Sequence, residues 1–257
     1  MCIRDSAGEE QTLFESLAET LGYHANKDAM LHLALRAPLR AIRECPEALL
    51  FGTAGFLLPV LPDSCTAEAV AHHKKLWTQW WPLREQFELA PERSFPWTFS
   101  GSRPANHPQR RAGALAVIAA DFATFKRLCH SGPAEELADY LSSLRHPYWS
   151  THVTLPSAPS PRPMALMGRD RILDFTVNHL FPAKGDEHAW LHYLSLRAGQ
   201  AGTKVLSVHQ SLLGGRPDAK AFLAKAWHHQ ALLQIHEDLC SLHSCTVCSL
   251  IGRMGKK

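Results

Sequence analysis

Long apolar runs are missing from this chain of 257 residues. No stretch of about 20 apolar residues occurs, so we expect no membrane span. The N-terminus also lacks the apolar core of a secretory signal, and the unevenly spaced cysteines do not form the pattern of a disulfide scaffold. These absences favour a cytoplasmic protein with reduced thiols.

Catalytic signatures are missing too. The sequence contains no nucleophile elbow, no His-Glu-x-x-His zinc motif, no P-loop and no Gly-x-Gly-x-x-Gly fingerprint. The net charge of +3 is mild, whereas nucleic-acid-binding proteins usually cluster their basic residues on one face. The sequence therefore assigns no catalytic centre and leaves open whether the protein is an enzyme.

Strand patterns are scarce, whereas helical patterns fill most of the chain. Only residues 151–155 alternate in the manner of a strand, and apolar residues elsewhere recur at helical spacing. We expect helices over residues 9–21, 29–35, 39–42, 47–58, 67–81, 108–125, 134–144, 169–181, 187–196, 205–213 and 218–239. The predicted fold class is all-α, an irregular multi-helix array that ends in a Cys-rich C-terminal tail.

Local signals predict how this array is organised. Residues 1–6 resemble an adapter-derived hexapeptide and are expected to be non-native, which leaves residues 7–257 as a single helical domain. Five prolines make 146–163 the expected hinge or irregular connection. Thr66 is the expected N-cap of the helix that follows it. The glycines of 47–58 should let neighbouring elements approach that helix closely.

Several blocks of the sequence together resemble a bacterial family of uncharacterised function, the domain-of-unknown-function family 2851. The blocks are 14–26, 48–59, 102–111, 167–182 and 230–236, with the cysteine tail. The resemblance implies a longer protein with an additional β-rich N-terminal half, whose acidic motifs resemble PD-(D/E)XK nucleases. Any nuclease activity would belong to that missing half, because this chain has no Glu-x-Lys and its one Asp-x-Lys, at 218–220, opens a predicted helix.

The sharpest polar motif is the loop before residue 108. Asn106 can cap the following helix and Pro108 suits its first turn. With Arg103, Arg110 and Arg111 nearby, that helix start could bind an anion such as a backbone phosphate. The alternative is structural, with Arg103 tying the loop to buried carbonyls or to the carboxylate of Asp170 or Asp174.

Two groups of side chains on the predicted helix 67–81 are further candidates. Adjacent residues on a helix diverge by about 100°, so at most one histidine of the His72–His73 pair can face a common ion. Trp77, Trp80 and Trp81 follow two lysines in the mixture that nucleic-acid platforms use. Their spacing also fits an ordinary core stripe, which is the interpretation we favour.

The C-terminal tail contains a cluster of potential metal ligands. Cys240, Cys245 and Cys248 follow a C-x4-C-x2-C spacing that lets their thiolates converge on one ion. A structural zinc site needs a fourth ligand, and His236 is the local candidate. The alternatives are His243, a group from the missing half, an iron–sulfur cluster, or reduced thiols that pack a helix end.

Two functions compete at this point. The first is a nucleic-acid-associated accessory domain that supports the missing nuclease-like half, whose partners would be that half and DNA or RNA. The second is a structural or interaction scaffold that binds no nucleic acid. Basic residues gathered on one continuous face would favour the first, and scattered basic residues paired with carboxylates would favour the second.

Overall fold

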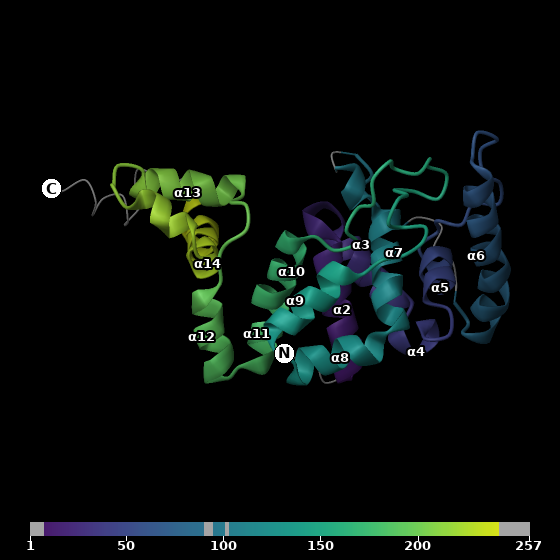
Figure 1. Cartoon of the computed structure of the whole chain (residues 1–257), viewed down its shortest axis with the longest axis horizontal. Coiled ribbons are helices and arrows are strands. Elements are labelled where there is room, and N and C mark those ends of the chain that lie inside the picture. Colours follow the sequence, from purple (N-terminus) through teal and green to yellow (C-terminus); the bar gives the residue numbers. More distant parts are fainter. Residues whose placement is uncertain (1–7, 90–94, 101–102, 242–257) are drawn as a thin grey trace. The chain divides into compact units, whose positions relative to one another are not determined.

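The computed structural model describes residues 8–89, 95–100 and 103–241 (Figure 1). Within these ranges the regular structure is helical and no strand occurs, only an isolated antiparallel bridge between Arg197 and Lys225. The predicted all-α class is confirmed. Residues 1–6, which we predicted to be non-native, lie outside the described ranges.

The chain divides into two compact units, which we call unit 1 (Met1–Phe175) and unit 2 (Thr176–Lys257). This division corrects the prediction of a single domain over 7–257. The boundary lies within a nearly unbroken helical run, so no proline, glycine or change of composition marks it.

The proline-containing segment 146–163 is not a boundary between domains. It belongs to unit 1, where Tyr148, Trp149, His152 and Leu155 are all buried. Residues 151–155 form turns instead of the expected strand. The aromatic side chains hold this segment in the core, although its backbone is irregular.

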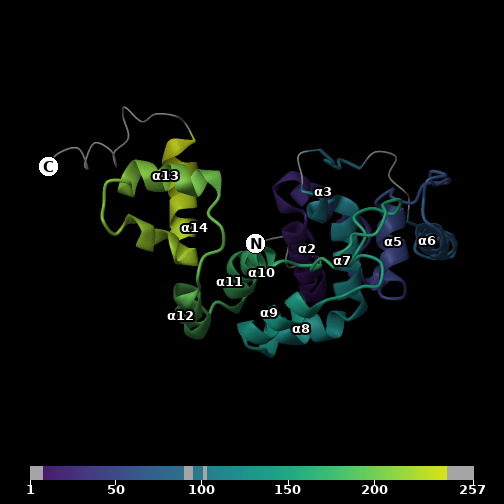
Figure 2. The same ribbon diagram turned by 45° about the horizontal axis from the view of Figure 1, so that its top comes forward.

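Unit 1 is an array of packed helices (Figures 1 and 2). Its elements are α2 (Glu9–Leu21), α3 (Tyr23–Arg36), α4 (Leu39–Ile42), α5 (Pro46–Thr53), α6 (Ala67–Gln86), the 3-10 turn η1 (Pro104–Asn106), α7 (Pro108–Ala120), α8 (Phe122–Ser131), α9 (Ala134–Ser143) and α10 (Arg169–Phe175). Helix α2 packs on α3, α7 and α10, and α5 packs on both α6 and α7. Helix α6 lies at the edge of the unit, beyond α5.

Several of these elements follow directly from local sequence. Phe14, Leu17 and Leu21 form the predicted apolar stripe of α2 and are fully buried. The side chain of Thr66 caps α6 as expected, accepting a hydrogen bond from the Ala69 N–H at 3.2 Å. The predicted helix 108–125 is broken at Asp121, whose φ of −120° and ψ of 44° separate α7 from α8.

Two glycines allow aromatic rings to approach the helices closely. A Cβ atom built on Gly52 of α5 would lie 2.1 Å from the Trp80 ring, which confirms the predicted close approach in this helix. A Cβ atom on Gly113 of α7 would lie 2.5 Å from the Trp149 ring. Both distances are well inside van der Waals contact, so these rings rest directly on helix backbone.

Unit 2 is smaller and has a modest core. Its elements are the π-helical turn η2 (Thr176–Leu180), α11 (Phe181–Lys184), α12 (Glu187–Ser195), α13 (Thr203–Leu213), the 3-10 turn η3 (Ala219–Leu223), α14 (Ala226–Ile235) and the π-helical turn η4 (His236–Cys240). Val205, Val208 and Leu232 join α13 to α14, and Cys240 packs against this cluster. The predicted helix 218–239 therefore consists of three shorter pieces.

Candidate functional site

The loop and helix start around Pro108 do not present their arginines to solvent together. Arg103 is exposed, but Arg110 and Arg111 are 0% and 2% exposed. Asn106 lies in η1 and does not cap α7. The cap is His107, whose Nδ1 accepts a hydrogen bond from the Gln109 N–H at 3.3 Å. This placement corrects the prediction of one accessible anion site.

Arg110 binds main-chain carbonyls in the core instead. Its Nε donates to the Trp149 carbonyl at 3.1 Å and its Nη1 to the Ala105 carbonyl at 3.1 Å. Its Nη2 donates to the carbonyls of Met164 and Ala165 at 2.8 and 2.9 Å. The planar guanidinium, with five donors in fixed directions, can join three separate segments at once. Burial lowers the pKa of Arg110 to about 10.

Arg111 ties the same segments together from the next position. It donates to the Leu166 carbonyl at 2.7 Å and to the Ala105 carbonyl. Its guanidinium also lies 5.3 Å from the centre of the Tyr23 ring, over which Arg171 stacks at 4.1 Å. Burial lowers the pKa of Arg111. We predicted, as the structural alternative, that Arg103 binds buried carbonyls. Arg110 and Arg111 have this role instead.

The predicted metal ligands are only partly placed. Cys245 and Cys248, and the alternative ligand His243, lie outside the described residues. His236 and Cys240 are the two ends of η4, and Cys240 packs against the apolar cluster of unit 2. In the part of the chain that the structure describes, no group of three His, Cys, Asp or Glu side chains is arranged so that it could hold a metal ion.

A polar cluster that sequence reasoning missed lies in unit 1, centred on Glu47 in the first turn of α5. The Glu47 Oε1 atom lies 2.7 Å from the Nε2 atom of His72 on α6 and accepts a hydrogen bond from the Trp149 indole. Its Oε2 atom lies 3.6 Å from the Nε2 atom of His146. One carboxylate therefore joins α5, α6 and the segment after α9. The sequence signal that could have identified this cluster was Glu47, a single acidic residue in an otherwise apolar helix.

Stacked rings extend this cluster into the core. The Tyr148 ring lies parallel between His72 and His152, with centroids 4.0 and 3.8 Å apart. The Tyr148 hydroxyl donates to the Leu155 carbonyl, and His152 is completely buried. Only His72 of the His72–His73 pair faces the cluster, whereas His73 stacks on Trp77. These contacts make the cluster a packed polar centre within the core of unit 1.

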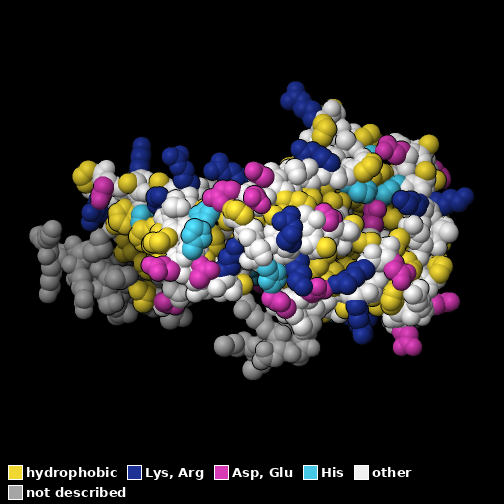
Figure 3. Space-filling view, turned by 60° about the horizontal axis from the view of Figure 1, so that its bottom comes forward, with side chains coloured by type: hydrophobic (Ala, Val, Ile, Leu, Met, Phe, Trp, Pro, Cys, Tyr) yellow, Lys and Arg dark blue, Asp and Glu magenta, His cyan; other side chains and the backbone are white. Residues whose placement is uncertain are grey.

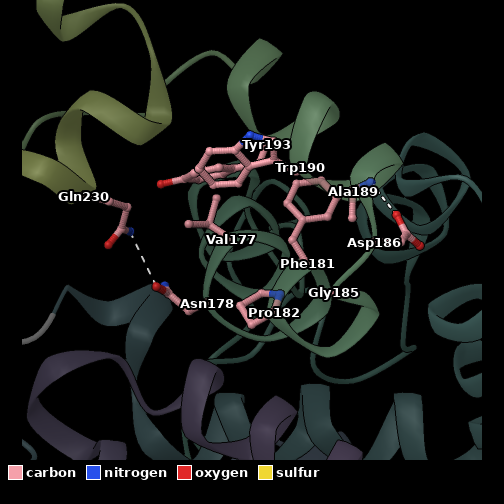
Figure 4. Close-up of a pocket in the computed structure, with 10 residues that line it drawn as sticks. All are labelled: Val177, Asn178, Phe181, Pro182, Gly185, Asp186, Ala189, Trp190, Tyr193 and Gln230. Atoms are coloured by element: carbon pink, nitrogen blue, oxygen red, sulfur yellow. Dashed lines mark hydrogen bonds between the residues drawn. The ribbon is translucent and has the colours of Figure 1, made fainter.

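A cavity of about 400 Å³ opens in unit 2 between the π-helical turn η2, α11, α12 and α14 (Figure 4). Aromatic rings form its walls, and two amide side chains face each other at one end. Gln230 donates to Asn178 there at 3.4 Å, a long hydrogen bond. The lining residues are Val177, Asn178, Phe181, Pro182, Gly185, Asp186, Ala189, Trp190, Tyr193 and Gln230.

Comparison with known proteins identifies the family. The sequence matches a family model described as a protein of unknown function, DUF2851, over residues 4–190, which is well over half of the chain. This chain belongs to the DUF2851 family. No curated protein and no solved structure matches it.

The DUF2851 match covers the helices of unit 1 and ends within α12. It therefore includes the arginine centre, the Glu47 cluster and the aromatic side of the cavity up to Trp190. Among the described residues, no helix is both long and apolar enough to span a bilayer.

Ionisation of the Glu47 cluster in this DUF2851 domain depends on its hydrogen bonds. Burial alone would raise the pKa of Glu47, but His72, the charge of His146 and the Trp149 indole outweigh that effect and lower it. Burial lowers the pKa of His146, outweighing the opposite effect of Glu47. The Nδ1 atom of His146 accepts hydrogen bonds from the Tyr148 and Trp149 N–H groups, each at 3.2 Å, so the neutral ring is the form that fits.

We expect the free energy of unfolding to fall as the pH drops from 7 towards 4. The lowered pKa of His146, and of His73, His107 and His229, means that the unfolded chain takes up protons first, near the ordinary value of 6.5. Glu47 adds a further loss as the pH falls through its own lowered value. Each excess proton on the unfolded chain contributes a slope of at most about 1.4 kcal/mol per pH unit.

Urea unfolding at a series of pH values measures this slope. His146→Asn should flatten it, because the amide oxygen can still accept a backbone hydrogen bond and does not titrate. A free energy of unfolding that rises between pH 7 and 5 would contradict the assignment of neutral buried histidines.

Proposed function

We propose that this chain is a helical interaction module that binds other proteins and not nucleic acid. The observation that carries the proposal is the internal use of Arg110 and Arg111. Their donors bind five carbonyls of the protein itself, on Ala105, Trp149, Met164, Ala165 and Leu166. A phosphate would have to displace these contacts within the core.

The surface charges support the same proposal. Many exposed or half-exposed cations pair with carboxylates: Lys27 with Glu19, Arg43 and Lys126 with Glu10, Arg171 with Asp174, Lys204 with Glu237, and Arg216 with Asp218. On the face shown in Figure 3, basic and acidic side chains are interspersed. Nucleic-acid binding depends on a basic stripe or patch that releases counterions.

Exposed aromatic side chains are the kind of surface that protein partners use. Trp190 is 57% exposed, Trp81 39% and Trp227 36%. Tryptophan and tyrosine are enriched among the residues that dominate binding energy at protein interfaces. They provide a large apolar contact area and a polar atom that can still form a hydrogen bond.

Fluorescence anisotropy with labelled single-stranded DNA, duplex DNA and RNA tests the proposal. Even non-specific nucleic-acid binders reach Kd values of about 100 to 1 µM at physiological salt, and bind more tightly at lower salt. We therefore expect no saturable signal at low salt with about 10 µM protein. Saturable binding that weakens as salt is added would overturn the proposal.

A nucleic-acid-associated accessory role is the second candidate, and one surface of α6 favours it. Trp77 and Trp81 lie edge to face with centroids 5.2 Å apart, and Arg84 lies 5.2 Å over the Trp81 ring. Lys74 is exposed one turn before them. Bases stack on such rings when a basic groove follows the backbone. Trp81→Ala should abolish any binding in the anisotropy titration if this candidate is right, whereas Trp190→Ala should not.

A structural zinc ion held by Cys240, Cys245, Cys248 and His236 remains a proposal that rests on the spacing of these residues. Metal analysis of protein purified without chelator tests it directly. Stoichiometric zinc that a Cys245→Ser, Cys248→Ser variant loses would support the site. Protein without zinc or iron would overturn it, and bound iron would indicate the cluster alternative.

A further inference from the structure

We propose that the aromatic cavity of unit 2 binds the proline-rich segment 156–163 of a second copy of this chain. This inference rests on the proposed interaction function and names its partner. The cavity and the segment match in apolar character, hydrogen-bonding groups and charge.

The cavity has the features of a site for an extended peptide. The rings of Trp190 and Tyr193 follow one another on α12, with centroids 5.6 Å apart and an interplanar angle of 43° (Figure 4). The Phe181 ring meets Tyr193 edge to face at 6.4 Å, and Pro182 continues the apolar wall. Aromatic-lined grooves of this kind bind proline-rich segments in the polyproline II conformation.

The two amides of the cavity can bind a peptide backbone. Asn178 and Gln230 share only one long hydrogen bond of 3.4 Å, which leaves further donors and acceptors on both side chains. Proline lacks an N–H group, so a proline-rich segment presents mainly carbonyl acceptors. Amide donors at the end of an aromatic groove match that pattern.

Segment 156–163 is such a peptide and is largely accessible. Its sequence is Pro-Ser-Ala-Pro-Ser-Pro-Arg-Pro, and Pro159, Pro161, Arg162 and Pro163 are exposed. The Ser160 N–H donates to the Thr151 carbonyl at 2.8 Å and the Met164 N–H to the Ser150 carbonyl at 2.7 Å. These two bonds hold the segment against unit 1 while its prolines project. Fixed proline dihedrals also lower the entropy lost on binding.

The charges of the two surfaces are complementary. Asp186 lines the cavity and Glu187 follows it at the start of α12, both exposed. Asp186 caps that helix by accepting a hydrogen bond from the Ala189 N–H at 2.7 Å. Among the described residues, neither Asp186 nor Glu187 forms an ion pair, and neither does Arg162 of the segment. A bound segment could bring the Arg162 guanidinium to these carboxylates.

The geometry of the proposed contact is head to tail. Unit 2 of one copy contacts unit 1 of the next, so a dimer keeps one free cavity on one copy and one free segment on the other. Such a heterologous contact does not close by itself, and association should continue beyond the dimer as concentration rises.

Sedimentation velocity of the full chain, from micromolar to about 1 mM protein, tests the proposal. Two variants each alter one side of the proposed contact. Trp190→Ala removes an aromatic ring from the cavity wall, and the triple variant Pro159→Ala, Pro161→Ala, Pro163→Ala removes the exposed prolines of the segment. Each should weaken self-association at least about tenfold, as removal of a central binding residue does. Both changes lie at exposed positions, so circular dichroism should show that the variants remain folded.

Mixing the two variants gives the decisive result. Each variant keeps the surface that the other lacks, so the mixture should form a dimer that grows no further. Leu206→Ala, which truncates an exposed apolar side chain of unit 2 that does not line the cavity, should associate as the unaltered chain does.

Three outcomes would overturn the inference: an unaltered chain that stays monomeric, a mixture that forms no dimer, or a Leu206→Ala effect equal to that of Trp190→Ala. Nucleic-acid binding in the anisotropy titration would instead overturn the proposed function, so the two failures are distinguishable.

Discussion

Arg110→Met should lower the free energy of unfolding by about 4 kcal/mol, the largest effect that we expect from a single substitution in this protein. Methionine fills much of the same volume, but it leaves four carbonyls without the donors that Arg110 provides. Each unsatisfied buried polar group costs about 1–3 kcal/mol, and relief from burying a charge offsets part of the loss. Urea unfolding measures the change.

Two other substitutions make this prediction specific. Arg103→Met alters an exposed arginine in the same loop and should change stability by less than about 0.5 kcal/mol. Arg110→Lys keeps the charge, but its donors lie on a single nitrogen, whereas Arg110 uses three nitrogens to reach four carbonyls, so lysine should recover less than half of the loss. It also serves as the milder variant if Arg110→Met does not fold. A loss below about 1 kcal/mol for Arg110→Met would contradict the role of this side chain.

Glu47→Ala should cost about 3 kcal/mol, because it removes the acceptor of the Trp149 indole and the carboxylate beside His72 and His146. Glu47→Gln should cost less, since its amide oxygen can still accept from the indole. Unfolding monitored by tryptophan fluorescence would follow both variants. The fluorescence of folded Glu47→Ala should also shift if Trp149 loses its hydrogen bond.

Glu68→Ala is the matched control for the Glu47 cluster. The Glu68 carboxylate lies 3.9 Å from His152, but its side chain is 58% exposed, so its removal should change stability by less than about 0.5 kcal/mol. Equal losses for the Glu47 and Glu68 variants would show that the cluster does not hold the segments together.

The all-α class and most helix positions could be predicted from the sequence because their causes are local. An apolar stripe buries α2, and the Thr66 hydroxyl reaches an N–H three residues along the chain. The close approach at Gly52 could also be expected from a glycine in an apolar helix. Helix breaks were harder to predict, because they can depend on distant residues. At the kink in α3, the Asn26 side chain forms two hydrogen bonds with the backbone of Thr98, 72 residues away.

The candidate sites depended on contacts that no local pattern encodes. The same four residues before and within α7 could bind a phosphate or the protein's own carbonyls, and residue type does not distinguish these uses. The carbonyls that decide the matter for Arg110 come from segments 39, 54 and 55 residues further on. Burial of those segments turns a potential anion site into a structural centre. Glu47, likewise, becomes part of a cluster only because α6 and His146 fold against it.

The sequence by itself determined the helical class, the family and the positions of most helices, since periodicity, caps and glycines act over a few residues. Only the tertiary structure decided that the chain divides after Phe175, that the proline-rich segment packs within unit 1, and that Arg110 and Arg111 are internal. It also brought η2, α11, α12 and α14 together around an aromatic cavity. These features arise from side chains distant in sequence, whose burial and hydrogen bonds are fixed only when the whole chain is packed.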